Sequence, residues 1–278
     1  MGAASSAAAA PPRSPPANPK ASRQAIRAKA SALAGRKEPV EEIIQPAHGT
    51  GDVHWGYTGA NGPQAWASLK PEFAICATGK RQSPINIDDS ITLRGPAEAI
   101  GFDYNTSSAT VVNNGHTIQI DVTGDNGILV RGTRYQLLQL HFRHPSEERI
   151  NHRSFPMAAH LVHKDYLGRL AVVAVLLETG EANTAINKFW TYMPLGPGDR
   201  VAMPPASVDL KQMLPKDQRY YQFMGSLTTP PCTEDVLWMI LKQPVTLSHE
   251  QIRMFAQQFP SNARPVQPIN GRVVRDAQ

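Results

Sequence analysis

Short apolar stretches and apolar–polar alternation with period two dominate the chain after residue 117, and both are typical of β-strands. Residues 117–122 (TIQIDV) and 134–143 (RYQLLQLHFR) alternate, and residues 158–163 (AAHLVH) form a short apolar run. Residues 170–178 (LAVVAVLLE) and 235–245 (DVLWMILKQPV) are nearly continuous apolar runs, as expected for strands buried on both faces. The pattern predicts a mainly β protein.

Only one segment predicts a good helix, residues 248–259 (SHEQIRMFAQQF). Ser248 suits the N-cap, and Gln251 three residues later completes a capping-box pattern. Phe255 and Phe259 fall on one face of this helix. The 24 prolines and 20 glycines elsewhere favour turns and loops over a helical bundle.

The first fifty residues differ in composition from the rest. Residues 1–50 are rich in alanine and proline and predict a disordered basic tail or linker, with one short helix through residues 22–35. Aromatic residues and apolar alternation begin near Asp52, so we expect one folded domain over residues 51–274. No repeat of 20–50 residues is visible.

The net charge of +5 resides mostly in that tail, which holds seven basic and three acidic residues. The remaining 228 residues are nearly neutral, and no basic patch interleaved with aromatic residues accompanies the tail, so nucleic acid is not an expected partner. No run of 18 apolar residues predicts a membrane-spanning helix, and the N-terminus lacks the pattern of a signal peptide. The oligomeric state is not readable from the sequence.

Two cysteines, Cys76 and Cys232, leave two alternatives open. They form either two buried thiols, which the residues alone slightly favour, or one long-range disulfide, which would indicate an oxidising compartment.

The candidate chemistry lies in residues 138–148 (LQLHFRHPSEE). Because side chains alternate faces along a strand, Gln139, His141 and Arg143 point one way, and Leu138, Leu140 and Phe142 point the other way. Three successive polar residues on one face of a β-rich core are costly unless they serve a site. On a second strand, His160 and His163 face opposite sides.

Six short motifs occur in one order along the chain. They are HWGY (54–57), RQSPINI (81–87), VNNGHT (112–117), HLVH (160–163), GSLTTPPC (225–232) and NARPVQPINGR (262–272). Each is weak alone, but in this order and spacing the chain resembles the α-class carbonic anhydrases, bacterial type, over residues 54–272.

The resemblance implies a single domain with a large, twisted, mostly antiparallel central sheet and a few short surface helices. It implies a zinc lyase that reversibly hydrates CO2 to bicarbonate and a proton, with CO2 and bicarbonate as small-molecule substrates. Zn2+ would be held by His141 and His160, and Gln139 would orient His141.

Further roles follow from the matching positions. Thr228 would bond the zinc-bound hydroxide, Glu147 would orient Thr228, and His116 would shuttle protons. Tyr57, Asn114 and Gln119 would organise water along the proton path. The CO2 pocket would be formed by Val162, Val172, Leu227, Thr229 and Trp238. Cys76 and Cys232 match a disulfide, which implies a periplasmic or secreted location.

The chain departs from the family pattern at two positions. The second zinc ligand falls at Arg143, which stays protonated and cannot ligate a metal. The carboxylate that normally supports the third ligand is replaced by Ala158. A bulge between His141 and Pro145 would re-aim His144 into the site as a substitute ligand.

Two functional alternatives therefore accompany the enzyme. One is a catalytically inactive relative with impaired zinc binding, which acts as an anion- or partner-binding module. The other is a cell-surface or periplasmic module that uses the sheet for protein or glycan contacts.

Overall fold

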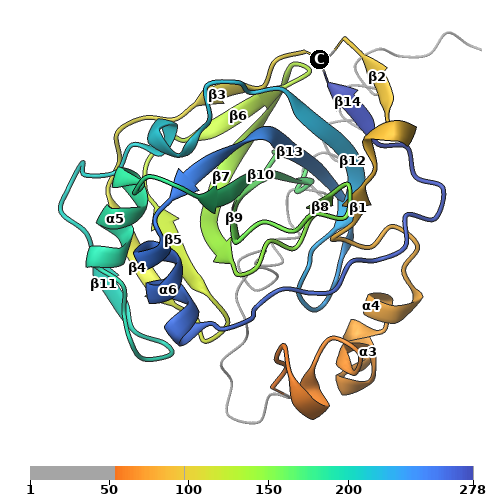
Figure 1. Cartoon of the computed structure of the whole chain (residues 1–278), viewed down its shortest axis with the longest axis horizontal. Coiled ribbons are helices and arrows are strands. Elements are labelled where there is room, and N and C mark those ends of the chain that lie inside the picture. The colour runs from red at the N-terminus through yellow and green to blue at the C-terminus, as the bar shows by residue number, and fades with distance from the viewer. Residues whose placement is uncertain (1–53, 97, 278) are drawn as a thin grey trace, which may run out of the picture. The chain divides into compact units, whose positions relative to one another are not determined.

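A sheet of twelve strands organises the described residues, 54–96 and 98–277, in the computed structural model (Figure 1). The prediction of a tail over residues 1–50 lies outside them. Along the sheet the strands are β11 (Arg200–Ala202), β4 (Ala109–Asn113), β5 (Ile118–Val122), β7 (Thr133–Arg143), β9 (Met157–Lys164), β10 (Leu170–Thr179), β13 (Glu234–Leu247), β12 (Tyr220–Ser226), β14 (Arg275–Ala277) and β2 (Leu93–Gly95). Strand β6 (Gly127–Val130) joins β7 and β3 (Gly101–Asp103), while β1 (Asn86–Ile87) and β8 (Arg149–Ile150) form a separate parallel pair.

The mostly antiparallel prediction is confirmed, because in the twelve-stranded sheet only β10–β13 and β14–β2 pair in parallel. The five predicted strands correspond to β5, β7, β9, β10 and β13, with boundaries within two residues. Eight successive residues of β10, from Leu170 to Leu177, are buried, as a strand covered on both faces requires.

Helices are short and few in the described part of the chain. They are α3 (Trp66–Leu69), α4 (Ile75–Thr78), α5 (Thr184–Thr191) and α6 (His249–Gln258), with 3-10 turns η1 (Gly59–Asn61), η2 (Pro71–Phe73), η3 (Asp89–Ile91) and η4 (Leu210–Met213). The capping box predicted for α6 is present: Ser248 Oγ accepts from Gln251 N, and Gln251 Oε1 accepts from Ser248 N. Helix α5, capped by Asn183, was not predicted.

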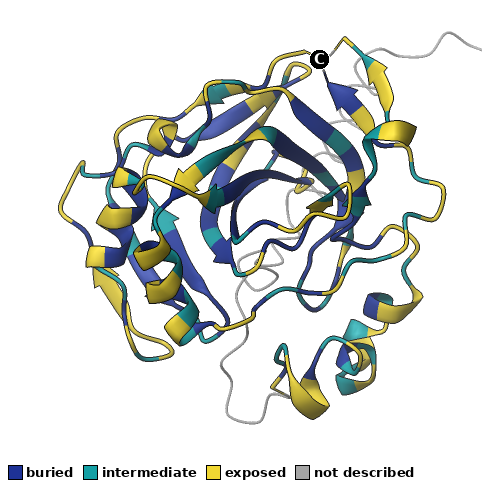
Figure 2. Cartoon of the chain, in the orientation of Figure 1, coloured by how far each residue is buried: buried dark blue, intermediate teal, exposed yellow. Residues whose placement is uncertain are grey.

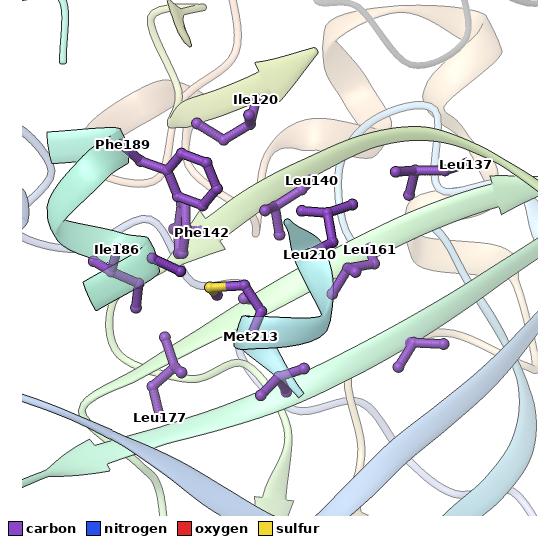
Figure 3. Close-up of a cluster of buried hydrophobic side chains, with 14 of the residues drawn as sticks. Ile120, Leu137, Leu140, Phe142, Leu161, Leu177, Ile186, Phe189, Leu210 and Met213 are labelled. Carbon is purple, nitrogen blue, oxygen red and sulfur yellow. The ribbon is translucent and has the colours of Figure 1, made fainter. Parts of the chain in front are cut away.

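The main hydrophobic core lies on one side of the central strands, beneath α5 and η4 (Figure 3). Phe142 of β7 contacts Trp190 of α5 edge to face, with ring centroids 4.8 Å apart. Both helices α5 and α6 show exposed outer surfaces in Figure 2, whereas the central strands are buried. The core therefore fixes one face of β7 and leaves the other face for polar side chains.

A register shift between Leu137 and Gln139 in the β7–β9 pairing changes the predicted alternation. Leu137, Leu140 and Phe142 belong to the core, whereas Leu138 is only partly buried and does not. Placing Leu138 on the core face was therefore wrong. The extra residue of the bulge shifts the alternation by one. Odd-numbered residues face the core before the bulge, and even-numbered residues face it after the bulge.

The structure confirms a disulfide between Cys76 of α4 and Cys232. It joins the two ends of a 156-residue interval and packs with Trp55 and Trp66. The slight preference for free thiols, drawn from composition alone, was wrong.

His163 of β9 makes folding stability depend on pH. Its side chain is fully buried beside the Tyr104 hydroxyl, and burial lowers the pKa of His163 from 6.5 to about 3. Between these values the unfolded chain binds a proton that the folded chain does not. The free energy of unfolding should therefore fall as the pH drops below 6.5, by about 1.4 kcal/mol per pH unit from this group.

Urea unfolding from pH 7 to pH 4 would measure this slope in the wild type and in His163→Gln, which removes the titrating ring. The variant should show a shallower slope, whereas the exposed control His152→Gln should keep the wild-type slope. Equal slopes in all three proteins would contradict the assignment to His163.

Candidate active site

His141 and His160 are direct partners across β7 and β9, and their side chains share the face opposite the core. Their ring centroids are 5.2 Å apart and nearly perpendicular. The structure thus brings together the two histidines that the sequence analysis placed at one site.

Each of these imidazoles is held by a hydrogen bond at one nitrogen. Gln139 Oε1 lies 3.0 Å from His141 Nδ1, and Glu148 Oε2 lies 3.1 Å from His160 Nε2. Because both oxygens accept, each bonded ring nitrogen carries the proton, which leaves lone pairs on His141 Nε2 and His160 Nδ1. Burial, then the charge of Arg143 and the neighbouring His160 ring, lower the pKa of His141 well below its usual range. His141 is therefore neutral at physiological pH.

The two histidines fit a zinc ion. His141 Nε2 is buried and has no hydrogen-bond partner within the described residues. Two imidazoles that share one tetrahedral zinc, with Zn–N bonds of about 2.0–2.1 Å, have ring centroids roughly 5 Å apart. No group of three or more histidine, cysteine or carboxylate side chains is arranged for a metal in residues 54–96 and 98–277. The site therefore offers two protein ligands.

Arg143 occupies the third position on the same face and does not fit a metal. Burial lowers the pKa of Arg143, but Tyr57, Glu147 and Glu148 together raise it by more, so the net shift is upward and the guanidinium stays charged. Its side chain is 4% exposed, and Nε donates to Glu147 Oε2 at 3.1 Å. Arg143 Nη1 has no hydrogen-bond partner among the residues that the structure describes.

Both carboxylate oxygens of Glu147 accept hydrogen bonds from arginine residues. Its Oε2 accepts from Arg143 Nε and its Oε1 accepts from the backbone N of Arg264 at 2.8 Å. Within the described chain no hydrogen bond joins Glu147 to Thr228, although Thr228 is buried at 5% exposure. Arg143 therefore stands at the expected position of the second ligand and also binds Glu147, the carboxylate expected to orient Thr228.

The structure does not bring His144 to the other two histidines. Its Nδ1 lies 3.0 Å from the carbonyl oxygen of Pro260, and its backbone N donates to Asn262. The register runs without interruption from Gln139 to Arg143, so the bulge in this strand lies before His141 and not after it. The rearrangement that would make His144 a ligand is absent.

Hydrogen bonds link three of the four residues expected along the proton path, since the backbone N of His116 donates to Asn114 Oδ1 at 3.0 Å. Asn114 Nδ2 donates to Gln119 Oε1 at 3.1 Å, and Gln119 is the cross-strand partner of His141. The His116 ring stacks on Trp55 with centroids 3.8 Å apart. Tyr57 Oη is buried without a hydrogen-bond partner in the described part, and burial raises its pKa.

Three of the residues expected to form the apolar pocket lie on neighbouring strands. Val172 of β10 pairs with Val162 of β9 on one side and with Trp238 of β13 on the other. The Trp238 ring lies 5.1 Å from the His160 ring, edge to face. Leu227, the residue after β12, is buried, and Thr229 is partly exposed.

Sequence reasoning missed Glu148, whose carboxylate supports His160. Its Oε1 is also a buried atom without a partner among residues 54–96 and 98–277. The signal was present in the consecutive acids of PSEE, because a second acidic residue beside a site residue is costly to bury unless it is hydrogen-bonded.

The fold is that of the carbonic anhydrase class, and comparison with known proteins agrees. A family model described as "Eukaryotic-type carbonic anhydrase" matches residues 61–278. A carbonic anhydrase of Neisseria gonorrhoeae is 45% identical over 230 residues, covering 82% of this chain and 89% of the relative. A Klebsiella pneumoniae carbonic anhydrase is 43% identical over 224 residues, covering 80% and 90%.

Solved structures show the same similarity. The α-carbonic anhydrase of Thermovibrio ammonificans in complex with sulfanilamide superposes with a TM-score of 0.77 at 39% identity, covering 81% of this chain and 99% of that one. Dioscorin complexed with ascorbate superposes with a TM-score of 0.75 at 31% identity, covering 81% and 99%. The chain belongs to the eukaryotic-type carbonic anhydrase family. Its function is that of a carbonic anhydrase, the reversible hydration of CO2.

Proposed function

We propose that this chain hydrates CO2 at the sheet face shared by His141 and His160, with zinc held by His141 Nε2 and His160 Nδ1. One observation carries the proposal: each ring is hydrogen-bonded at its other nitrogen, so both lone pairs are available for a metal. Zinc bound there would supply a water molecule with a pKa near 7. The coordination position at Arg143 would be left to water.

The remaining roles belong to the residues of the chain. Val162, Val172 and Trp238, with Leu227 and Thr229, would hold CO2 against the metal face and exclude bulk water. His116 would carry protons outward, and Tyr57, Asn114 and Gln119 would order the water between the metal and His116. Thr228 would direct the attacking oxygen.

We also propose an oxidising compartment, the periplasm or the extracellular space. The disulfide between Cys76 and Cys232 supports this location, because such bonds persist where thiols are not kept reduced. None of the helices in the described residues is long and apolar enough to cross a membrane.

The test is zinc content and CO2 hydration of purified full-length protein compared with His141→Ala. The variant should lose both zinc and activity, because one of only two ligands is gone. His144→Ala is the matched control and should keep the wild-type values, since its ring contacts Pro260. Wild-type protein that binds no zinc and does not hydrate CO2 would refute the proposal and favour the anion- or partner-binding alternative.

A further inference from the structure

His160 receives its supporting carboxylate from an unexpected part of the chain. The position two residues before it, which carries a carboxylate in the family pattern, is Ala158, a fully buried methyl group on the same face of β9. The carboxylate of Glu148 reaches His160 Nε2 instead, at 3.1 Å, from the segment between β7 and β9. The side chains of His160 and Glu148 are 1% and 0% exposed.

The backbone around Glu148 is fixed on both sides. Ser146 Oγ donates to the carbonyl oxygen of Glu148 and accepts from Phe155 N, each at 2.9 Å. The next residue, Arg149, donates its backbone N to Ile85 O. The carboxylate is therefore presented from an anchored loop, which is the requirement for holding a ring in one orientation.

The carboxylates of Glu147 and Glu148 lie on either side of the His160 ring, and only that of Glu147 forms an ion pair with Arg143. Glu147 Oε2 lies 3.8 Å from His160 Nδ1, but it already accepts from Arg143 Nε at 3.1 Å. Within the described residues no arginine or lysine forms an ion pair with Glu148, and its Oε2 lies closer, 3.1 Å from His160 Nε2. A charge-assisted hydrogen bond to Glu148 favours the proton at Nε2 and leaves the Nδ1 lone pair facing the site.

We propose that Glu148 is a positioning residue, which fixes the tautomer and orientation of His160 in place of the carboxylate missing at Ala158. The inference rests on the proposed function in one respect, the role of His160 as a metal ligand. The tautomer of the His160 ring can be measured without a metal, and the first experiment uses metal-free protein.

The first readout is the tautomer of His160, measured by long-range 1H–15N NMR on EDTA-treated, 15N-histidine-labelled full-length protein. The wild type and Glu148→Gln, which keeps an oxygen acceptor, should show the proton at Nε2. Glu148→Ala should give a mixture of tautomers. The rescue variant E148A/A158E, which returns a carboxylate to β9, should restore the Nε2–H form.

The second readout is Co2+ affinity, followed by absorption titration. Glu148→Ala should weaken it by about 10–100-fold, the usual cost of losing a group that orients a metal ligand. E148A/A158E should recover most of that loss. Unchanged tautomer and unchanged affinity in Glu148→Ala would overturn the role of Glu148.

A folding defect in Glu148→Ala would move the comparison to Glu148→Gln and Glu148→Met, which fill similar volumes although only glutamine offers an oxygen. An Nε2–H tautomer that is kept in Glu148→Gln and lost in Glu148→Met supports the proposal. The same tautomer in both variants overturns it. CO2 hydration is measured separately. Its absence from wild type with the Nε2–H tautomer intact would overturn the proposed function and not the role of Glu148.

Discussion

Replacing Arg143 with histidine is expected to raise zinc affinity by about 100-fold or more and to raise the rate of CO2 hydration. A ligand contributes directly to the metal, so its effect should exceed the roughly 10–100-fold effect of a supporting group. The substitution acts twice, because it adds a nitrogen donor and releases Glu147 Oε2 from Arg143 Nε. That oxygen then becomes available to orient Thr228.

Competition with a chromophoric zinc chelator would measure affinity, and stopped-flow pH-indicator assays would measure hydration. Arg143→Lys is the control, since it keeps a cation and supplies no imidazole; it should bind zinc no better than wild type. A histidine variant with wild-type affinity and rate would show that the polar face of β7 is not the metal site.

The second large effect concerns stability. Glu147→Ala should lower the free energy of unfolding by about 3–5 kcal/mol, because it leaves the Arg143 charge buried without its ion-pair partner. Both side chains of this pair are almost completely buried, at 4% and 0% exposure. The backbone N of Arg264 would lose its acceptor as well.

Urea unfolding with the disulfide intact would measure the loss, and E147A/R143L should recover a large part of it by removing the stranded charge. Glu147→Gln keeps an oxygen for Arg264 N and should fall between wild type and Glu147→Ala. If E147A/R143L were as unstable as Glu147→Ala, the cost would come from Arg264 and not from the buried charge.

Alternation along β7 predicted that Gln139 and His141 share one face, because strand period is a local property. That His160 meets His141 followed from the resemblance to the carbonic anhydrases, because strand period does not show which strands are neighbours. Glu148 was not predictable in this way, since its carboxylate reaches His160 from a loop whose path is set by contacts distant in sequence. The ion pair between Arg143 and Glu147 depends on the same loop, because Glu147 lies in it.

The errors within the fold also have physical causes. Leu138 was misplaced because a bulge interrupts the period of two, and the leucine pair before Gln139 does not reveal which member is the extra residue. Helix α5 was missed because Thr184, Asn187 and Lys188 interrupt its apolar positions in only eight residues. Its stability comes from packing Phe189 and Trp190 against the core.

The bulge at Leu138 changes which residues of β7 face the core. Tyr135 and Leu137 face the core before the bulge, and Leu140 and Phe142 face it afterwards. Deleting Leu138, the extra residue, would restore regular alternation from Leu137 to Leu140 and keep His141 on the face opposite Phe142. Strand β7 can therefore lose one residue at the bulge without exchanging its two faces.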